Sequence, residues 1–269
     1  MLSIIIVIFK TDKQKLQLVL DKINKNLPII FIVNDPNYNF DGLIILQKHA
    51  FLKSENDGNG AAINLALKTI KTEYAIYLDI DIFFELNFFE EMINAANIIK
   101  DFSILVPNHG NLNSKNDILE KYDGEASVIF FNMSKLEKIG HFDQNFFLYY
   151  EETDLLLRCK NINEKVYFLP KIRIKHFRAS SIVDETNEIH NLRSWHYMWS
   201  KFYFYRKNYS YFYALKKTYK LLFYDFIKLI LFIVCFNSKS LVTRYYRIWG
   251  LVSSMLFMRS FLRPNLNKN

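Results

Sequence analysis

Two aspartates at the end of an apolar run are the sharpest local feature of the sequence. Asp79 and Asp81 follow the apolar segment 74–78, with a single residue between them. In open α/β sheets, ligands collect beyond the carboxyl ends of the strands, and paired carboxylates there bind a hard divalent cation that also contacts phosphate oxygens. The functional interpretation is a metal–diphosphate site. The alternative is a strand end that turns into solvent, because short motifs recur freely.

A polar turn at 55–60 leads into an alanine-rich helical segment. Gly58 and Gly60 permit close approach of a ligand to the backbone, and the helix N-terminus that follows favours an anion. Taken alone, the segment is also an ordinary helix start.

Three acids, Glu151, Glu152 and Asp154, follow the aromatic run 146–150. Acids at a helix start are stabilised by the helix dipole, and Asp154 has the spacing of an ion pair with Arg158. However, adjacent aromatic surface desolvates a carboxylate and raises its proton affinity towards that of a general base. Both interpretations remain open at this level.

A single histidine, His176, follows the strand-like segment 165–169. A lone histidine is more often packed or on the surface than a ligand. The other five histidines lack the spacing of a metal site, and no Cys/His set resembles a zinc centre. Two cysteines cannot form a disulfide framework, so a reducing compartment is expected.

The elements that position these residues alternate between short apolar runs and stretches of helical periodicity. This rhythm is typical of a mostly parallel sheet covered by helices, and it predicts an α/β sandwich with nucleotide-binding topology. Strands are predicted at 2–8, 28–33, 43–47, 74–79, 102–107, 127–132 and 165–169. Helices are predicted at 12–25, 60–71, 86–100 and 151–160.

The charge of the 269-residue chain changes sign near residue 190. Residues 1–190 carry a net charge of −5, whereas 191–269 hold 14 Lys and Arg against one acid, Asp225, for +13. Beyond about residue 188 the strand pattern stops, and 22 of the 45 aromatic residues lie in the last 79 positions. We therefore expect two regions, 1–190 and 191–269, the second helical and directly continuous with the first.

Composition excludes several classes of protein. The 51% hydrophobic content excludes a disordered chain, and the seven glycines and five prolines exclude collagen-like and low-complexity chains. The apolar run 229–236 is shorter than the roughly 18 residues that cross a bilayer, so no transmembrane helix is expected. The apolar run 1–9 is too short for a signal peptide or a span and is interpreted as a buried strand.

Taken in order, the motifs resemble a family 2 glycosyltransferase with the GT-A fold, over roughly residues 2–210. Phe9 and Lys10 resemble the family's nucleotide loop after the first strand, and Asp35 resembles the strand end that meets the base. Segment 56–64 resembles the Asn-x-Gly…Asn helix start, and 79–81 falls where the family has its Asp-x-Asp.

Downstream, segment 140–158 resembles the family's Gly-Gly-Phe-Asp…Glu-Asp-x-Asp-Leu…Arg, and His176 with Ser180 resembles its late His…Ser element. Within that family, the motifs resemble the rhamnosyltransferase-type branch. Enzymes of this branch build bacterial surface polysaccharides such as lipopolysaccharide. Glu152 stands where the family usually has an aspartate base, so the base assignment stays open between Glu152 and Glu151.

The resemblance implies metal-dependent, inverting transfer of a sugar, rhamnose in the named branch, from a nucleotide-sugar donor to a lipid-linked glycan or an oligosaccharide. Asp81 and His176 are the implied ligands of a divalent metal ion, magnesium or manganese, and Glu152 or Glu151 is the implied catalytic base. A non-catalytic, membrane-associated partner in a polysaccharide assembly complex is the rival, but the intact acids argue against it. The expected nucleotide-sugar-binding residues are Phe9, Lys10, Asp35, Asn56, Gly58, Asn64 and Asp79.

The basic, aromatic segment 191–263 fits a membrane interface. Tyr and Trp prefer the headgroup level, and Lys and Arg are attracted to anionic lipid. The same composition also suits nucleic-acid binding, or aromatic side chains that simply pack helices together. We expect peripheral association with the cytoplasmic, inner face of the cell membrane through an anionic membrane surface, and no nucleic-acid partner.

Overall fold

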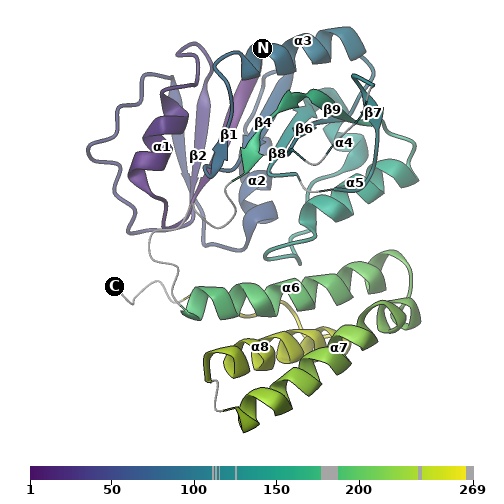
Figure 1. Cartoon of the computed structure of the whole chain (residues 1–269). Coiled ribbons are helices and arrows are strands. Elements are labelled where there is room, and N and C mark those ends of the chain that lie inside the picture. Colours follow the sequence, from purple (N-terminus) through teal and green to yellow (C-terminus); the bar gives the residue numbers. More distant parts are fainter. Residues whose placement is uncertain are drawn as a thin grey trace. The chain divides into compact units, whose positions relative to one another are not determined.

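The computed structural model describes residues 1–110, 112, 114, 116–124, 126–176, 187–235 and 238–264 (Figure 1). The chain divides into two compact units. The first comprises Met1–Phe142 and Leu155–Val183, and the second comprises Asp143–Asp154 and Asp184–Asn269. Segment Asp143–Asp154, which the sequence places inside the first region, thus packs with the C-terminal helices.

An eight-stranded sheet forms the centre of the first unit. Its strands are β1 Leu2–Ile8, β2 Ile29–Val33, β3 His49–Lys53, β4 Tyr74–Leu78, β6 Ile104–Asn108, β7 Leu119–Glu120, β8 Val128–Asn132 and β9 Val166–Arg173. The spatial order is β3-β2-β1-β4-β8-β6-β9-β7, in which only β8 and β7 run antiparallel to their neighbours. The α/β fold with a mostly parallel sheet, followed by C-terminal helices, is confirmed.

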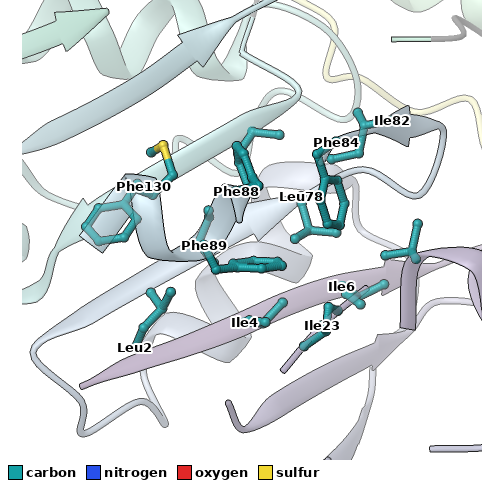
Figure 2. Close-up of a cluster of buried hydrophobic side chains, with 14 of the residues drawn as sticks. Leu2, Ile4, Ile6, Ile23, Leu78, Ile82, Phe84, Phe88, Phe89 and Phe130 are labelled. Carbon is teal, nitrogen blue, oxygen red and sulfur yellow. The ribbon is translucent and has the colours of Figure 1, made fainter. Parts of the chain in front are cut away.

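Helices cover both faces of this sheet. One face packs against α1 (Lys13–Leu20) and α3 (Phe88–Ile99), and the other packs against α2 (Asn59–Leu67), the short η1–α4 turn (Met133–Ile139) and α5 (Glu151–Asn161). Side chains of β1 alternate between the two cores because successive residues of a strand point to opposite faces. Figure 2 shows the first core, where phenylalanines that include Phe88 and Phe89 lie over Ile4 and Ile6.

The strand predicted at 43–47 is wrong, and the strand in this part of the chain is β3. Leu43 and Ile45 pack on the first core cluster, whereas Ile44 and Leu46 are exposed. This alternation mimics a strand, although 43–47 has no place in the sheet. The two-residue strands β5 (Ile82–Phe83) and β10 (Lys175–His176) are too short to be recognised from periodicity.

Three helices dominate the second unit, namely α6 (Asn187–Asn208), α7 (Tyr211–Val234) and α8 (Ser238–Met255). Each contacts the other two, and α6 crosses α8 at Gly250, where an added Cβ would lie 2.2 Å from the Trp195 carbonyl oxygen. Only glycine permits this approach. None of the helices in the described part of the chain combines the length and apolarity needed to cross a membrane.

His196 is buried on α6 and ties this helix to the C-terminal segment. Its Nε2 donates to the Leu262 carbonyl at 3.0 Å, and the Ser260 hydroxyl lies 3.1 Å from Nδ1. Burial lowers the pKa of His196 from 6.5 to about 3. The folded chain therefore holds this imidazole neutral, whereas the unfolded chain protonates it in mild acid.

We expect the second unit to lose stability as the pH falls below 6.5. Between the unfolded and folded pKa values the unfolded state binds more protons, so acid favours unfolding. From this group alone the free energy of unfolding should be about 1.4 kcal/mol lower at pH 5.5 than at pH 8. Urea denaturation of the wild type and His196→Gln measures the difference. Identical pH slopes in the two proteins would contradict it.

Candidate functional site

Polar residues gather at one edge of the sheet in the first unit. Strands β1, β2, β4 and β6 run in the same direction, so their carboxyl ends meet at this edge. The residues that directly follow these strands are Phe9, Asn34, Asp79 and His109. The edge therefore combines loops that lie far apart in the sequence.

Asp79 is held in place through its side chain and its backbone. The Tyr77 hydroxyl donates to its carboxylate and also lies 3.2 Å from Oδ1 of Asn59, at the N-terminus of α2. The backbone N–H of Asp79 donates to the Ser127 carbonyl at 2.9 Å. A phenol hydroxyl that donates to a carboxylate fixes the orientation of that carboxylate.

His109 extends this network to β6, and sequence reasoning missed it. Its Nε2 accepts from the Ser127 backbone N–H at 3.2 Å and lies 2.8 Å from the Ser127 hydroxyl. Tyr77, Asn59 and Ser127 were missed as well. The position of His109 directly after a strand is the signal that could have identified it, since strand ends converge at this edge.

The end of β2 offers two buried polar atoms to a ligand. Within the described residues, Oδ1 of Asn34 and the Tyr38 hydroxyl have no hydrogen-bond partner. Burial, with the nearby charges of Asp12 and Asp35, raises the pKa of Tyr38 to about 12, so its hydroxyl remains a neutral donor. Unpaired buried polar atoms are costly, and this donor–acceptor pair beside the buried Asp35 fits a group such as a nucleobase.

Strained backbone marks two of the predicted binding loops. Lys10, directly after Phe9, has φ +46°, and Asn56 has φ +56°, both in the left-handed region. Gly58 caps α2 with φ +112° and has no side chain to cover the first N–H groups of that helix. For residues other than glycine such conformations are costly, and they cluster at functional sites.

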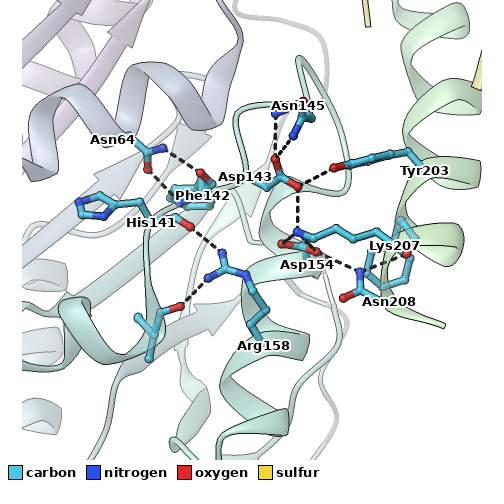
Figure 3. Close-up of polar contacts among 12 residues, drawn as sticks. Asn64, His141, Phe142, Asp143, Asn145, Asp154, Arg158, Tyr203, Lys207 and Asn208 are labelled. Atoms are coloured by element: carbon cyan, nitrogen blue, oxygen red, sulfur yellow. Dashed lines mark hydrogen bonds and ion pairs between the residues drawn. The ribbon is translucent and has the colours of Figure 1, made fainter. Parts of the chain in front are cut away.

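Asn64 has a structural role that the sequence did not indicate. Its Nδ2 donates to the Phe142 carbonyl and its Oδ1 accepts from the Phe142 N–H, both at 2.9 Å (Figure 3). In the same turn, the Arg158 guanidinium donates to the carbonyls of Ile139 and His141. The amide of Asn64 thus anchors α2 to the turn, and direct donor binding by this residue stays a prediction.

Asp81 and His176 are brought together although 94 residues separate them in the sequence. In the β5–β10 ribbon, Ile82 pairs with His176. The backbone of His176 therefore lies beside the residue that follows Asp81, and Asp81 itself is buried. The side chain of His176 and the whole of Ser180 lie outside the described residues.

The donor set at this point fits a divalent cation that is shared with a diphosphate. Among the described side chains, no group of three or more His, Cys, Asp or Glu is arranged to hold a metal ion. Magnesium and manganese, however, favour oxygen ligands, and magnesium is commonly held by one or two carboxylates together with substrate phosphates. Asp79 and Asp81 supply such carboxylates, and the pairing of His176 with Ile82 brings the backbone of His176 beside the residue that follows Asp81.

A cavity of about 360 Å³ borders Asp81. Its walls are mostly apolar and come from α1 and the segment around β5. Lys22 is one of the lining residues, and its Nζ lies 3.4 Å from the centre of the Phe83 ring and 2.7 Å from the Phe84 carbonyl oxygen. The lining residues are Lys15, Leu18, Val19, Lys22, Ile80, Asp81, Ile82, Phe83 and Phe84.

Glu151 and Glu152 begin α5 and belong to the second unit. The two residues before them, Tyr149 and Tyr150, have φ +68° and +69°, and each such conformation costs about 1–3 kcal/mol. Ring contacts with α6 compensate, because Tyr197 packs against both tyrosines. Glu151 is buried. The acidic helix start is therefore presented by a strained but firmly anchored turn.

A buried ion-pair network fastens this acidic segment to α6 (Figure 3). Lys207 Nζ lies 2.8 Å from carboxylate oxygens of both Asp143 and the fully buried Asp154. Asn208 donates to Asp154 at 3.0 Å, and Tyr203 donates to Asp143 at 3.0 Å. Burial is the largest single influence and would raise the pKa of Asp143, but the hydrogen bonds from Lys207 and Asn145 and the charge of Lys207 together outweigh it, so the net shift of the pKa is downward.

Replacing Lys207 with methionine should destabilise the protein by about 3–5 kcal/mol, because it leaves the buried Asp154 without its cation. The double variant Lys207→Met/Asp154→Asn should recover part of this loss, since it removes the uncompensated charge. Urea denaturation measures the effect. Lys239→Met, at an exposed position of α8, is the control and should stay within about 0.5 kcal/mol of the wild type. If Lys207→Met and Lys239→Met lowered the free energy of unfolding by similar amounts, the predicted contribution of the Lys207–Asp154 ion pair would be wrong.

Comparison with known proteins gives a fold but no family. No protein-family model matches the chain, and no curated protein matches it. Among solved structures, the mannosyltransferase PcManGT from Pyrobaculum calidifontis, in complex with GDP-Man and Mn²⁺, has a TM-score of 0.56 at 10% identity. That match covers 94% of this chain and 86% of PcManGT.

Two further structures show the same likeness. GalNAc-T7 with UDP, GalNAc and Mn²⁺ has a TM-score of 0.54 at 14% identity, over 76% of this chain and 49% of its own. TarS of S. aureus has a TM-score of 0.53 at 14% identity, over 72% of this chain. The chain spans 39% of that TarS chain, but 90% of a structure of TarS 1–349. The fold is therefore that of GT-A glycosyltransferases.

Proposed function

We propose that this protein is a metal-dependent glycosyltransferase that takes a sugar from a nucleotide-sugar donor. The observation that carries the proposal is the polar edge of the sheet, where Asp79 is oriented by Tyr77 and Ser127. The pairing of His176 with Ile82, beside Asp81, adds support. So do the glycosyltransferases of the same fold whose structures hold UDP or GDP-Man with Mn²⁺.

In this proposal the end of β2 binds the base, through Asp35 and the buried polar atoms of Asn34 and Tyr38. The loops at Phe9, Lys10, Asn56 and Gly58 surround the nucleotide, and Asp79 receives the ribose and diphosphate. Asp81 and His176 would hold the magnesium or manganese ion. When bound, this ion supplies Lewis-acid stabilisation of the charge that develops on the leaving diphosphate.

For the chemical step we propose inversion with a single carboxylate base. Glu152, or its neighbour Glu151, accepts the proton of the acceptor hydroxyl while that oxygen forms a bond to the anomeric carbon. The bond from the anomeric carbon to the diphosphate oxygen breaks, and its electron pair leaves with the nucleoside diphosphate. This step needs no covalent sugar intermediate. The assignment of the base rests on the sequence motif at 151–155.

The sequence motifs also suggest the domain boundaries, the location, the donor sugar and the acceptor. We propose that 1–190 is the catalytic domain and that 191–269 associates with the inner face of the cell membrane. The proposed donor sugar is rhamnose, carried by dTDP, and the acceptor is a lipid-linked glycan or an oligosaccharide of bacterial surface polysaccharide synthesis. These assignments rest on the resemblance of the motifs to a family 2, rhamnosyltransferase-like sequence.

A donor screen tests the proposal. The purified full chain is incubated with a panel of nucleotide sugars and Mn²⁺ or Mg²⁺, and release of nucleoside diphosphate is measured. We expect slow hydrolysis of one or a few donors, which stops with EDTA and returns when the metal is restored. If no donor is hydrolysed and calorimetry detects no binding of nucleoside diphosphate with either metal, the proposal fails.

A further inference from the structure

The aromatic side chains of the second unit fall into two groups. Those of α6 are mostly core residues, and Trp195, Trp199 and Phe202 are almost fully buried. The aromatic residues of α7 behave differently, because Phe212 is 81% exposed and Phe223 is 66% exposed. Packing of the helices thus explains the buried aromatic residues of α6 but not the exposed aromatic residues of α7.

The exposed apolar residues of α7 form one continuous face of the helix. Phe212, Tyr219 and Phe226 recur at intervals of seven residues, with Phe223 and Ile230 between and after them. At 100° per residue these positions lie on one side, opposite the buried residues Ala214, Thr218 and Asp225. One side of the helix is therefore packed in the unit, and the opposite side is apolar and exposed. We call the exposed side the α7 face.

Charge distinguishes between the occupants that such a face could have. The only acid on α7 is Asp225, which is fully buried and paired with Arg244 and Arg247 of α8. Lys216 and Lys220 are exposed and adjoin the α7 face. A symmetric contact between the α7 faces of two copies would bring these lysines against a helix whose only acid is buried and already paired. An anionic surface instead complements the face.

We infer that the α7 face binds an anionic phospholipid bilayer, with the helix lying in the plane of the interface. Exposed Phe, Tyr and Ile side chains enter the boundary between headgroups and acyl chains, and the adjoining lysines pair with lipid phosphates. No described helix meets the length and apolarity of a membrane span, so α7 lies on the bilayer and does not cross it. The inference deepens the membrane location proposed above and does not depend on the transferase chemistry.

Vesicle co-sedimentation of the full chain tests the inference. Vesicles of phosphatidylcholine alone are compared with vesicles that contain phosphatidylglycerol, at low and high salt and without donor or acceptor. We expect binding to the anionic vesicles at least about tenfold stronger than to the neutral ones, and weaker binding at high salt. Equal binding to both kinds of vesicle, or no binding to either, would overturn the inference.

Two pairs of variants locate the surface. Phe223→Glu/Ile230→Glu should weaken binding to anionic vesicles by about tenfold or more, because two apolar groups are lost and two negative charges are added. Its matched control is Leu86→Glu/Ile98→Glu, which makes the same change at exposed positions of the first unit, at 75% and 76% exposure. Lys216→Glu/Lys220→Glu should likewise weaken binding, whereas Lys25→Glu/Lys68→Glu should not.

Three further results would overturn the inference that the α7 face binds a bilayer. Unchanged binding of both α7 variants would overturn the inference, as would light scattering that shows a wild-type dimer converted to a monomer by Phe223→Glu/Ile230→Glu. Stronger retention by RNA than by anionic vesicles would do the same. Donor hydrolysis, measured without vesicles, tests the proposed transferase function separately. A failure of that function can therefore be distinguished from a failure of membrane binding.

Discussion

Replacing Asp81 with alanine should lower donor turnover by a factor on the order of 10²–10³, which is the scale of losing one group that stabilises a developing charge. Asp81 lies between β4 and β5 and directly precedes Ile82, which pairs with His176. Its loss removes an oxygen ligand from the point where we place the metal and the diphosphate. The effect should appear in kcat for donor hydrolysis at saturating Mn²⁺, and added metal should not restore it.

The control for this prediction is Asp123→Ala. Asp123 is a surface acid of the same unit, and its side chain is 81% exposed. This variant should retain the activity and the thermal transition of the wild type. Undiminished turnover of purified Asp81→Ala, with an unchanged thermal transition, would show that Asp81 is not a metal ligand.

Replacing Glu152 with glutamine should lower sugar transfer by about 10²–10⁴-fold, the usual contribution of a general base. Glutamine keeps the size of the side chain but cannot accept a proton from the acceptor hydroxyl. Binding of the nucleotide should be retained, because the proposed role of Glu152 is to accept a proton from the acceptor hydroxyl and other residues are proposed to bind the nucleotide. For this variant, an assay of sugar transfer to an acceptor should therefore show the loss, whereas calorimetry should show unchanged binding of the nucleoside diphosphate.

Glu151→Gln decides between the two candidate bases. If it abolishes transfer and Glu152→Gln does not, Glu151 is the base, and full activity in both variants would sink the carboxylate mechanism at this position. The matched control is Glu137→Gln, at an exposed glutamate of α4 in the first unit.

Much of the fold was readable because its determinants are local. Apolar runs predicted β1 and β4 nearly to the residue, and helical periodicity located α3 and α5. The failure at 43–47 has an equally local cause, since Leu43 and Ile45 pack on a core without joining the sheet. Periodicity records which side chains are buried but not which backbone groups pair.

The candidate site was predicted only where a strand end or a motif marked it. Asp79 and Asp81 were found in this way. His109 also follows a strand, but it was passed over because its partner Ser127 lies 18 residues further along the chain. Lys207 offered no signal either, since its partner Asp154 is 53 residues away. Side chains that act through distant partners are identified only when the chain folds.

The sequence by itself determined the α/β class, the placement of acids after a strand, and the change from an acidic to a basic region. Only the tertiary structure decided that His176 pairs with Ile82 and that Asn64 holds the Phe142 backbone. It also decided that Trp195, Trp199 and Phe202 of α6 are buried in the core, whereas Phe212 and Phe223 of α7 are exposed. Residue type sets what a side chain is able to do, but contacts between distant segments set what it meets, and those contacts exist only in the folded chain.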